Sequence, residues 1–333
     1  MSKEGGVSGG DLTAEALWYV GPGRAEIRQE RLDSPAKGMV RVRALHGAIS
    51  RGSESLIAAG RVPISEYQRM RGPYMSGSFP FPIKYGYATV GRVETGPDGL
   101  IGRTVFVLHP HQTIFDVPVD AAVAVPDNVP TSRAVLAANM ETALNATWDA
   151  VPISSGRIAV VGAGVVGALV GVVCARVAGA DVTLIDINPA REKLARALGL
   201  NFTKPDNAPV DCKLVVHTSG DPRGLATAIN IAGDEATILE MSWYGDGNVP
   251  VPLGGAFHSR RLKIVSSQVG MVAPSRRATT SHRQRLEQAM ALLADARLDA
   301  LLMPAVPFRE LPERLPDILN RQNDVLCQVI AYS

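Results

Sequence analysis

The sequence predicts an α/β protein with two parts, a β-rich part followed by a doubly wound parallel sheet. Short alternating segments, such as residues 40–45 and 104–108, are separated by glycine and proline from Ala16 to about Val125. This pattern is typical of a small β-rich domain. After Pro126, apolar runs of strand length alternate with helical patterns, which indicates repeated β-α-β units around a parallel sheet.

The expected elements follow in order along the chain. Residues 1–11 are rich in glycine and serine and lack the layout of a secretion signal, so we expect a mobile leader there. An amphipathic helix is expected at 283–296, and a final strand at 326–331 is expected to return to the first part. The strands expected in the parallel sheet are residues 158–161, 182–186, 214–217, 237–241 and 264–267.

Length, charge and cysteine content narrow the class of protein. The 333 residues suit roughly two domains. A net charge of +2 without a long basic stripe argues against nucleic acid as a partner. The longest apolar run, 165–175, is shorter than the roughly 20 residues of a membrane helix. The three cysteines show no CxxC spacing, which favours a reducing compartment and predicts a cytoplasmic protein.

A glycine turn follows the first expected strand of the parallel sheet. Gly162, Gly164 and Gly167 form a GxGxxG pattern that leads directly into a proline-free helical stretch. In such a turn the first glycine permits a tight bend, the second admits a pyrophosphate, and the third lets helix and strand pack closely. The start of the helix faces the anion with its partial positive charge. The turn therefore predicts a dinucleotide site.

Asp186 ends the next expected strand, 24 residues beyond Gly162. A carboxylate at this place accepts the hydroxyls of the adenosine ribose and repels the 2′-phosphate of NADP, so NAD is expected rather than NADP. Alternatively, the glycines only shape the helix–strand contact and Asp186 caps the next turn. Other residues assigned to the coenzyme are Val165 and Val166 at the helix start, Arg191, and the residues after later strands, Thr218, Ser219, Ser242 and Ser267.

Several segments together resemble the medium-chain dehydrogenase/reductase superfamily. They are residues 138–145, the GAGVVG turn, 186–188 and 217–220. Residues 49–54, 60–63 and 84–87 look like the branch typified by bacteriochlorophyllide a dehydrogenase. The resemblance implies a GroES-like substrate domain (12–135 and 270–333), a Rossmann NAD-binding domain (136–269), a substrate cleft between them, and a homodimer joined through the nucleotide domains.

The zinc ligands of alcohol dehydrogenases in this superfamily are missing. Ser50 matches the first cysteine, Tyr87 and Ala88 match the His-Glu pair, and Ala138 stands near the second cysteine. Zinc needs three or four deprotonated N, S or O ligands, so no zinc is expected. His109 and His111 are too few for a metal site on their own, and we expect solvated imidazoles at a strand end.

Without a metal, Tyr87 is the first candidate to hydrogen-bond a developing alkoxide, with Ser50 completing a relay. An ordinary tyrosine pKa is about 10, so acid–base work near neutral pH would need a neighbour such as Lys84, or the positive charge of the nicotinamide, to lower it. Alternatively, Tyr87 only packs beneath the cleft. Glu54 and Glu141 are other candidate proton carriers, although such carboxylates are more often solvated or ion-paired.

The leading hypothesis is a zinc-independent oxidoreductase that transfers hydride between NAD(H) and a secondary alcohol or ketone. The alternatives are a quinone or enone reductase and a non-catalytic dinucleotide-binding protein. Aromatic residues within 63–82 are expected to form either a lid for a bulky, hydrophobic small-molecule substrate or a self-packed surface loop. The arginines of 276–285 are expected to be solvated.

Overall fold

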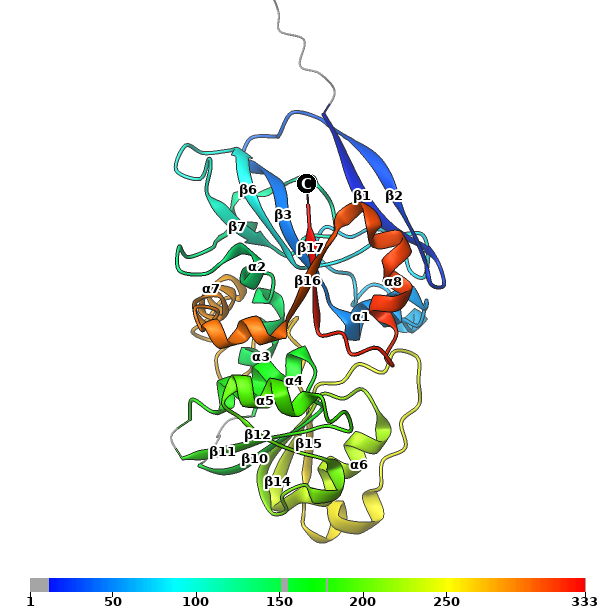
Figure 1. Cartoon of the computed structure of the whole chain (residues 1–333), viewed down its shortest axis with the longest axis vertical. Helices are drawn as coiled ribbons and strands as arrows, with labels where there is room; N and C mark the ends of the chain where they lie inside the picture. Colours follow the sequence, from blue (N-terminus) through cyan, green and yellow to red (C-terminus); the bar gives the residue numbers. More distant parts are fainter. Residues whose placement is uncertain (1–11, 151–154, 178, 333) are drawn as a thin grey trace, which may run out of the picture.

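The computed structural model describes residues 12–150, 155–177 and 179–332. The leader expected at residues 1–11 lies outside the described residues. A β-rich part and a parallel-sheet part lie one above the other along the long axis of the molecule (Figure 1). The expected fold class, a β-rich domain with a doubly wound parallel-sheet domain, is confirmed.

Two sheets form the β-rich part. A four-stranded sheet has the order β2 (Arg24–Leu32), β1 (Leu12–Gly21), β5 (Ile83–Lys84), β4 (Ser76–Gly77). The larger sheet has the order β16 (Leu302–Pro307), β17 (Cys327–Ala331), β3 (Met39–Ile49), β6 (Thr89–Thr95), β7 (Thr104–Val107), β9 (Val123–Ala124). A further strand, β8 (Ile114–Pro118), pairs with β3 outside this order. Helices α1 (Arg51–Ala58), α2 (Thr131–Ala134) and α8 (Leu311–Leu319) accompany them.

The chain end returns to the β-rich part, as expected. Strand β17 pairs antiparallel with β3, with Val329 opposite Ala48. Both residues are buried, so the last strand completes the same apolar core as the first part of the chain. Figure 1 shows β17, in red, beside the blue β3.

The lower sheet has the order β12 (Asn201–Thr203), β11 (Ala180–Ile185), β10 (Gly156–Val161), β13 (Cys212–His217), β14 (Ala232–Glu240), β15 (Lys263–Ser266). All neighbouring pairs in it are parallel. Numbered along the chain, this is the 3-2-1-4-5-6 order of a dinucleotide-binding sheet, whose ligand crevice lies where the order reverses, outside the carboxyl ends of the strands. The five expected strands are confirmed, and the three-residue β12 is an addition.

Helices cover both faces of the parallel sheet. In β10, Ile158 and Val160 face the cluster that contains α4 (Val165–Cys174) and α5 (Arg191–Leu198), whereas Ala159 and Val161 face α6 (Pro222–Ile231). This alternation explains why the strand reads as a continuous apolar run. The apolar stretch at 165–175 is accordingly a buried helix, α4.

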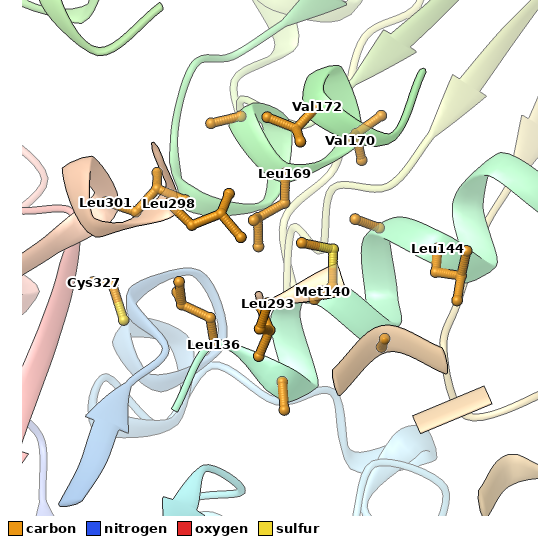
Figure 2. Packing of buried hydrophobic residues seen from close by; sticks show 14 of the residues in the cluster. Leu136, Met140, Leu144, Leu169, Val170, Val172, Leu293, Leu298, Leu301 and Cys327 are labelled. Atoms are coloured by element: carbon orange, nitrogen blue, oxygen red, sulfur yellow. The ribbon is translucent and has the colours of Figure 1, made fainter. Parts of the chain in front are cut away.

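An apolar cluster joins the two parts. Helices α3 (Ala137–Asp149) and α7 (His282–Leu292) contribute Met140 and Met290 to it, α4 contributes Leu169, and the terminal strand contributes Cys327. Figure 2 shows Leu136, Met140, Leu169 and Leu293 converging in this cluster. The expected domain boundaries at 136 and 270 stay a prediction, and α7 packs on α3 across the second of them.

The remaining elements are short helical turns at Ile64–Glu66, Val119–Ala121, Pro205–Asn207, Leu253–Phe257, Ala296–Leu301 and Phe308–Glu310. Helix α7 begins with a reciprocal cap between Ser281 and Gln284, which satisfies N–H groups that a helix start leaves unpaired. Cys174, Cys212 and Cys327 are buried free thiols. Within the described ranges, no helix has the length and apolar character needed to cross a membrane.

Candidate functional site

The glycine turn joins β10 to α4 at the carboxyl edge of the parallel sheet. Gly162 has a φ of 108°, which side chains with a Cβ rarely adopt. A Cβ on Gly167 would lie 1.9 Å from the Gly162 carbonyl oxygen, whereas nothing lies within 4 Å of a Cβ on Gly164. Val165 and Val166 then open α4 with N–H groups at its positive end. The backbone therefore has open space where a side chain of residue 164 would project.

Asp186 follows β11 and reaches back to the glycine turn. Its Oδ2 atom accepts the N–H of Ala163 at 2.8 Å, and its Oδ1 atom accepts the N–H of Asn188 at 2.8 Å. Each carboxylate oxygen has two lone pairs, so each retains one for a further donor. The side chain is half-buried. Two backbone hydrogen bonds therefore fix a carboxylate beside the turn while leaving it able to accept hydroxyl groups.

Residues 320–326, here called the C-terminal strap, connect α8 to β17. Asp324 of the strap accepts from Arg191 at 2.7 Å. Arg321 donates to the carbonyl of Gly220, which follows β13, at 3.3 Å. The strap thus contacts the carboxyl edge of the parallel sheet on both sides of β10: it pairs with Arg191 of α5 and contributes Arg321.

Arg51, the first residue of α1, joins this group of arginines. Burial, together with the nearby positive charge of Arg191, lowers its pKa. Its Nε atom is buried and has no hydrogen-bond partner among the described residues. Its Nη atoms donate to strap carbonyls, at Asn320 (2.7 Å), Asn323 (3.2 Å) and Val325.

Arg51, Arg191 and Arg321 carry three positive charges, which Asp324 and Asp221 balance in part: Asp324 pairs with Arg191, and Asp221 lies within electrostatic reach of Arg321. Such a group suits a phosphate-bearing ligand, because guanidinium groups bind phosphate with paired hydrogen bonds. Sequence reasoning identified Arg191 but missed Arg51 and Arg321. The one local signal for Arg51 was its place directly after Ser50 at a helix start; the partners of both arginines are distant in sequence.

The structure brings Thr218 and Ser219 to the glycine turn. Thr218 donates to the carbonyl of Gly162 at 2.8 Å, and a Cβ on Gly162 would lie 2.6 Å from the backbone nitrogen of Ser219. Ser242, after β14, accepts the N–H of Gly220 at 3.1 Å. These residues follow adjacent strands, as expected for one sheet edge.

Ser267 stands apart from this group. It follows β15, the edge strand, and its hydroxyl donates to Asp149 of α3 at 2.7 Å. Strands β13 and β14 separate β15 from β10. The structure therefore does not join Ser267 to the glycine turn.

Tyr87 lies among hydroxyl groups at the start of α1. Its phenol donates to Ser50, in a short hydrogen bond, and lies 3.2 Å from the hydroxyl of Ser53. Burial raises its pKa, partly offset by the two serines. Lys84 was expected to lower this pKa, but its ammonium is held by Glu30 (2.6 Å) and Gln112 (2.8 Å). The expectation for Lys84 is therefore wrong, and Tyr87 is a neutral hydrogen-bond donor near neutral pH.

Glu54 is fully buried behind Ser50. Its carboxylate accepts the backbone N–H of Ser50 at 2.7 Å and the phenol of Tyr19 at 2.6 Å, and it lies 2.9 Å from Nε2 of His111. A buried carboxylate needs such donors because it has lost its water. Glu54 thus holds the backbone that presents Ser50.

His109 and His111 are buried, with exposed fractions of 4% and 0%, so the expectation of solvated imidazoles is wrong. The ring of His109 stacks on Phe115 at a centroid distance of 3.7 Å. Burial lowers the pKa of His109 to about 3, which keeps it uncharged. His109 is buried because its ring stacks on Phe115, and His111 is buried where it contacts Glu54. Neither contact is visible in the local sequence.

Glu141 does not join Tyr87. It lies on α3 and accepts from Arg285 of α7 at 3.0 Å, and Arg285 also donates to Asn145 at 2.6 Å. Arg285 is 2% exposed, so the expectation that it is solvated is wrong: it occupies the inner face of an amphipathic helix. Burial raises the pKa of Glu141 against the opposing charge of Arg285. The pair connects two helices, and nothing in its surroundings gives Glu141 access to a substrate.

Phe79, Tyr67 and Phe81 of the segment 63–82 pack on the core of the β-rich part, whereas Tyr74 is 38% exposed. Phe79 is buried in the core of the β-rich part, with its ring 5.5 Å from Tyr67 and 6.4 Å from Tyr85. Tyr85 meets Tyr87 edge-to-face at 6.0 Å. A continuous row of aromatic rings therefore leads from this segment to Tyr87.

The residues at the zinc position of the resembled enzymes do not fit the metal. Hydroxyl groups of Ser50 and Tyr87 and the methyl groups of Ala88 and Ala138 are not the deprotonated N, S or O donors that zinc requires. In the described ranges, no three His, Cys, Asp or Glu side chains form a group able to hold a metal ion.

Comparisons with known proteins agree with this geometry. The sequence profile of the ketopantoate reductase PanE/ApbA family matches residues 158–225, a stretch that begins in β10 and ends in α6 and includes the glycine turn and Asp186. No curated protein sequence matches the chain significantly.

Solved structures match nearly the whole chain. L-idonate 5-dehydrogenase from Escherichia coli has a TM-score of 0.78 at 14% identity, over 96% of this chain and 99% of that one. An E. coli alcohol dehydrogenase, RspB, complexed with NADH, has a TM-score of 0.75 at 17% identity, with the same coverage. A zinc-binding dehydrogenase from Sinorhizobium meliloti bound to NADP, whose zinc-binding assignment is provisional, has a TM-score of 0.75 at 14% identity, again over 96% and 99%.

The chain therefore has the two-domain fold of alcohol dehydrogenases of this kind, with a GroES-like part and a Rossmann part. The likeness is one of fold, at identities too low to transfer an activity. It agrees with the fold that the resemblance implies, whereas membership of the medium-chain dehydrogenase/reductase superfamily and of the branch of bacteriochlorophyllide a dehydrogenase stays a prediction.

Proposed function

We propose that this protein is a zinc-independent, NAD(H)-dependent oxidoreductase of the cytoplasm that acts on a secondary alcohol or its ketone. The observation that carries the proposal is the carboxylate of Asp186, fixed by two backbone hydrogen bonds beside a glycine turn with open space at Gly164. A dinucleotide needs this combination of an anion site and an adjacent acceptor for ribose hydroxyls.

The chain's own groups account for each part of the coenzyme. The N–H groups of Val165 and Val166 at the start of α4 face the diphosphate. Arg51, whose Nε is buried without a partner among the described residues, adds positive charge together with Arg191 and Arg321. Asp186 accepts the adenosine hydroxyls and disfavours a 2′-phosphate, which is the reason we propose NAD rather than NADP.

When bound, the nicotinamide supplies or accepts the hydride. Tyr87 turns its one phenol proton from Ser50 to the substrate oxygen as negative charge develops on that oxygen, the task that zinc performs elsewhere. Its raised pKa keeps the phenol protonated, which suits a donor. Ser50 and Ser53 orient the phenol, and Ser50 is the first group able to pass a proton onward. The aromatic row ending at Tyr87 favours a hydrophobic substrate.

Two other functions make different predictions. A quinone or enone reductase would prefer NADPH or would reduce these acceptors without oxidising alcohols, and Asp186 argues against the first property. A non-catalytic binding protein would bind NADH and turn over no alcohol, ketone, enone or quinone. Titration of the protein with NADH and NADPH, followed by a substrate panel, separates the three.

Asp186→Asn should weaken NADH binding about tenfold and reduce the preference for NADH over NADPH about 100-fold. The change removes the negative charge that repels the 2′-phosphate. It also removes one acceptor for the ribose hydroxyls, and a hydrogen bond to a charged group is worth about 1.5–3 kcal/mol. Fluorescence titration measures both dissociation constants. Asp181→Asn, an exposed residue at the other end of β11, serves as the control. An unchanged preference would refute the assignment of Asp186.

We propose that the protein is a homodimer joined through β15. This strand is the outer strand of its sheet, and all four of its residues are exposed. Ile264 and Val265 are exposed by 36% and 38%. An apolar edge strand is a template for pairing with a second copy. Val265→Lys should convert a dimer into a monomer in sedimentation velocity, and a monomeric wild type at micromolar concentration would overturn the proposal.

A further inference from the structure

Tyr74, in the segment 63–82, has its backbone in the left-handed region, with a φ of 57°. A bulky side chain rarely adopts this conformation, because its Cβ then approaches the following carbonyl oxygen. Residues held in such a conformation cluster at active sites and ligand contacts, where the surrounding structure fixes them. Tyr74 is also 38% exposed. Its strained backbone therefore presents a large aromatic side chain at the surface of the β-rich part.

The ring of Tyr74 is the outer member of a stack of three rings. It lies 5.5 Å from the ring of His109, with 23° between the two planes. His109 in turn stacks on Phe115 at 3.7 Å and 9°. Both inner rings are buried, so the stack is anchored in the core. Aromatic rings pair favourably with centroids about 4.5–7 Å apart, and a further planar group can continue this stack on Tyr74.

The stack carries no charge near neutral pH. Burial lowers the pKa of His109 to about 3 and raises the pKa of Tyr74 above its usual value. The ammonium of Lys84, which acts electrostatically on His109, is already held by Glu30 and Gln112. The stack therefore offers no counter-ion to a carboxylate or an amine, and it suits an uncharged ring.

Hydrogen bonds of the larger sheet place His109 at the same end of a strand pair as Tyr87. Thr89 of β6 pairs with Val107 of β7, and the hydroxyl of Thr89 donates to the carbonyl of His109 at 3.1 Å. Tyr87 comes two residues before Thr89, and His109 comes two residues after Val107. Neighbouring strands of a sheet lie about 4.8 Å apart, so the stack begins beside the candidate proton donor.

A second set of contacts brings the segment of Tyr74 to the same place. A Cβ on Gly72, two residues before Tyr74, would lie 3.6 Å from the ring of Tyr85. Tyr85 meets Tyr87 edge-to-face at 6.0 Å. Tyr74 is therefore connected to Tyr87 both through His109 and through its own segment, and its exposed ring lies close to the place assigned to the substrate oxygen.

We infer that Tyr74 determines substrate specificity: its exposed ring stacks on an aromatic ring of the substrate, which is an uncharged secondary alcohol or ketone with an aryl group. The inference rests on the proposed function, in which Tyr87 binds the substrate oxygen. A planar ring gains the pairing energy of two aromatic rings on Tyr74, whereas a puckered saturated ring of similar size does not. Because His109 already holds the tyrosine ring, little side-chain freedom is lost on binding.

The test compares acetophenone with cyclohexyl methyl ketone, which differ in having an aromatic or a saturated ring. Both are titrated by ligand-observed NMR in the presence of NAD⁺, which cannot reduce them, so that affinity is measured without turnover. The wild type should bind acetophenone about three- to tenfold more tightly, the effect of one aromatic pair. Tyr74→Gly should abolish this preference, and Tyr74→Phe, which keeps the ring, should retain it.

Two features of the design separate a loss of stacking from a loss of structure. Glycine adopts a positive φ without steric cost, so Tyr74→Gly is expected to fold, and its Tm verifies this. Ile101→Ala is the control. Ile101 is another exposed apolar side chain, in the turn at the opposite end of β6 and β7, and its variant should keep the wild-type preference.

The outcomes distinguish this inference from the proposed function. Equal affinity of the wild type for the two ketones, or no binding of either, would overturn the substrate class. A preference that persists in Tyr74→Gly would overturn the role of Tyr74. The proposed function survives either result if the protein binds NADH and turns over another alcohol or ketone in the panel. If the protein does not bind NADH, the proposed function fails, and this inference fails with it.

Discussion

Tyr87→Phe should lower kcat by about 100-fold or more while leaving the dissociation constant of NADH unchanged. Removal of one donor from an oxyanion site costs about 10²- to 10³-fold in enzymes that depend on it. The phenol of Tyr87 is the donor that the chain presents where the resembled enzymes place a metal ligand, and Ser50 and Ser53 hold it. The variant removes one oxygen atom and keeps the ring that packs on Tyr85.

Steady-state kinetics on the first alcohol found in a substrate panel measure this effect. Tyr67→Phe is the matched control, because Tyr67 belongs to the same row of rings but is separated from Tyr87 in it by Phe79 and Tyr85. Full turnover by Tyr87→Phe would show that the phenol only packs in the site. A loss of NADH affinity in parallel would indicate a folding defect, which Tm would reveal.

The pH dependence of the reaction rate should follow from the protonation state of Tyr87. Burial raises the pKa of Tyr87 above its ordinary value of about 10. The donating phenol therefore persists throughout the neutral range and is lost only as the pH rises through that raised value. Ketone reduction should accordingly not require deprotonation of Tyr87 at neutral pH. A tyrosine acting as a base would instead show rates that rise across the neutral range.

Much of the parallel sheet was predictable because its signals are local. An apolar run, a glycine turn and an acidic residue at the end of the next strand define β10, α4 and β11 within one short segment. Strand β12 was missed because its three residues, Asn201 to Thr203, carry no alternation or apolar run. The sheet itself supplies its stability, through pairing with β11.

The candidate site was predictable in part, for the same reason. Asp186 and the glycines belong to one pattern, whereas Arg51 reaches strap residues more than 260 positions away in sequence. Local sequence cannot reveal such a contact. His111 was misjudged because its environment is made by Glu54, 57 positions away. The contacts of His217 with Ser219 and Glu240, each 2.7 Å long, likewise form only when β13 and β14 pair.

Gly167→Ala should lower the free energy of unfolding by about 3 kcal/mol or more, which is the upper end of the usual cost of adding a group to a well-packed site. A Cβ at this position would lie 1.9 Å from the Gly162 carbonyl oxygen and 2.6 Å from the hydroxyl of Thr218. A backbone carbonyl cannot turn aside as a flexible side chain can, so α4 must move away from β10. Thermal unfolding should show a clear fall in Tm, and the displaced helix should lose NADH affinity as well.

Gly164→Ala separates the role of the turn in folding from its role in binding. Gly164 has a φ of −76°, which alanine adopts freely, and its Cβ would meet nothing within 4 Å. Tm should therefore stay near the wild-type value. The open space in front of Gly164 is the space we assign to the diphosphate, so the added methyl group should still weaken NADH binding about tenfold or more. Wild-type affinity in this variant would mean that the diphosphate lies elsewhere, because a group bound against these N–H donors could not avoid the methyl.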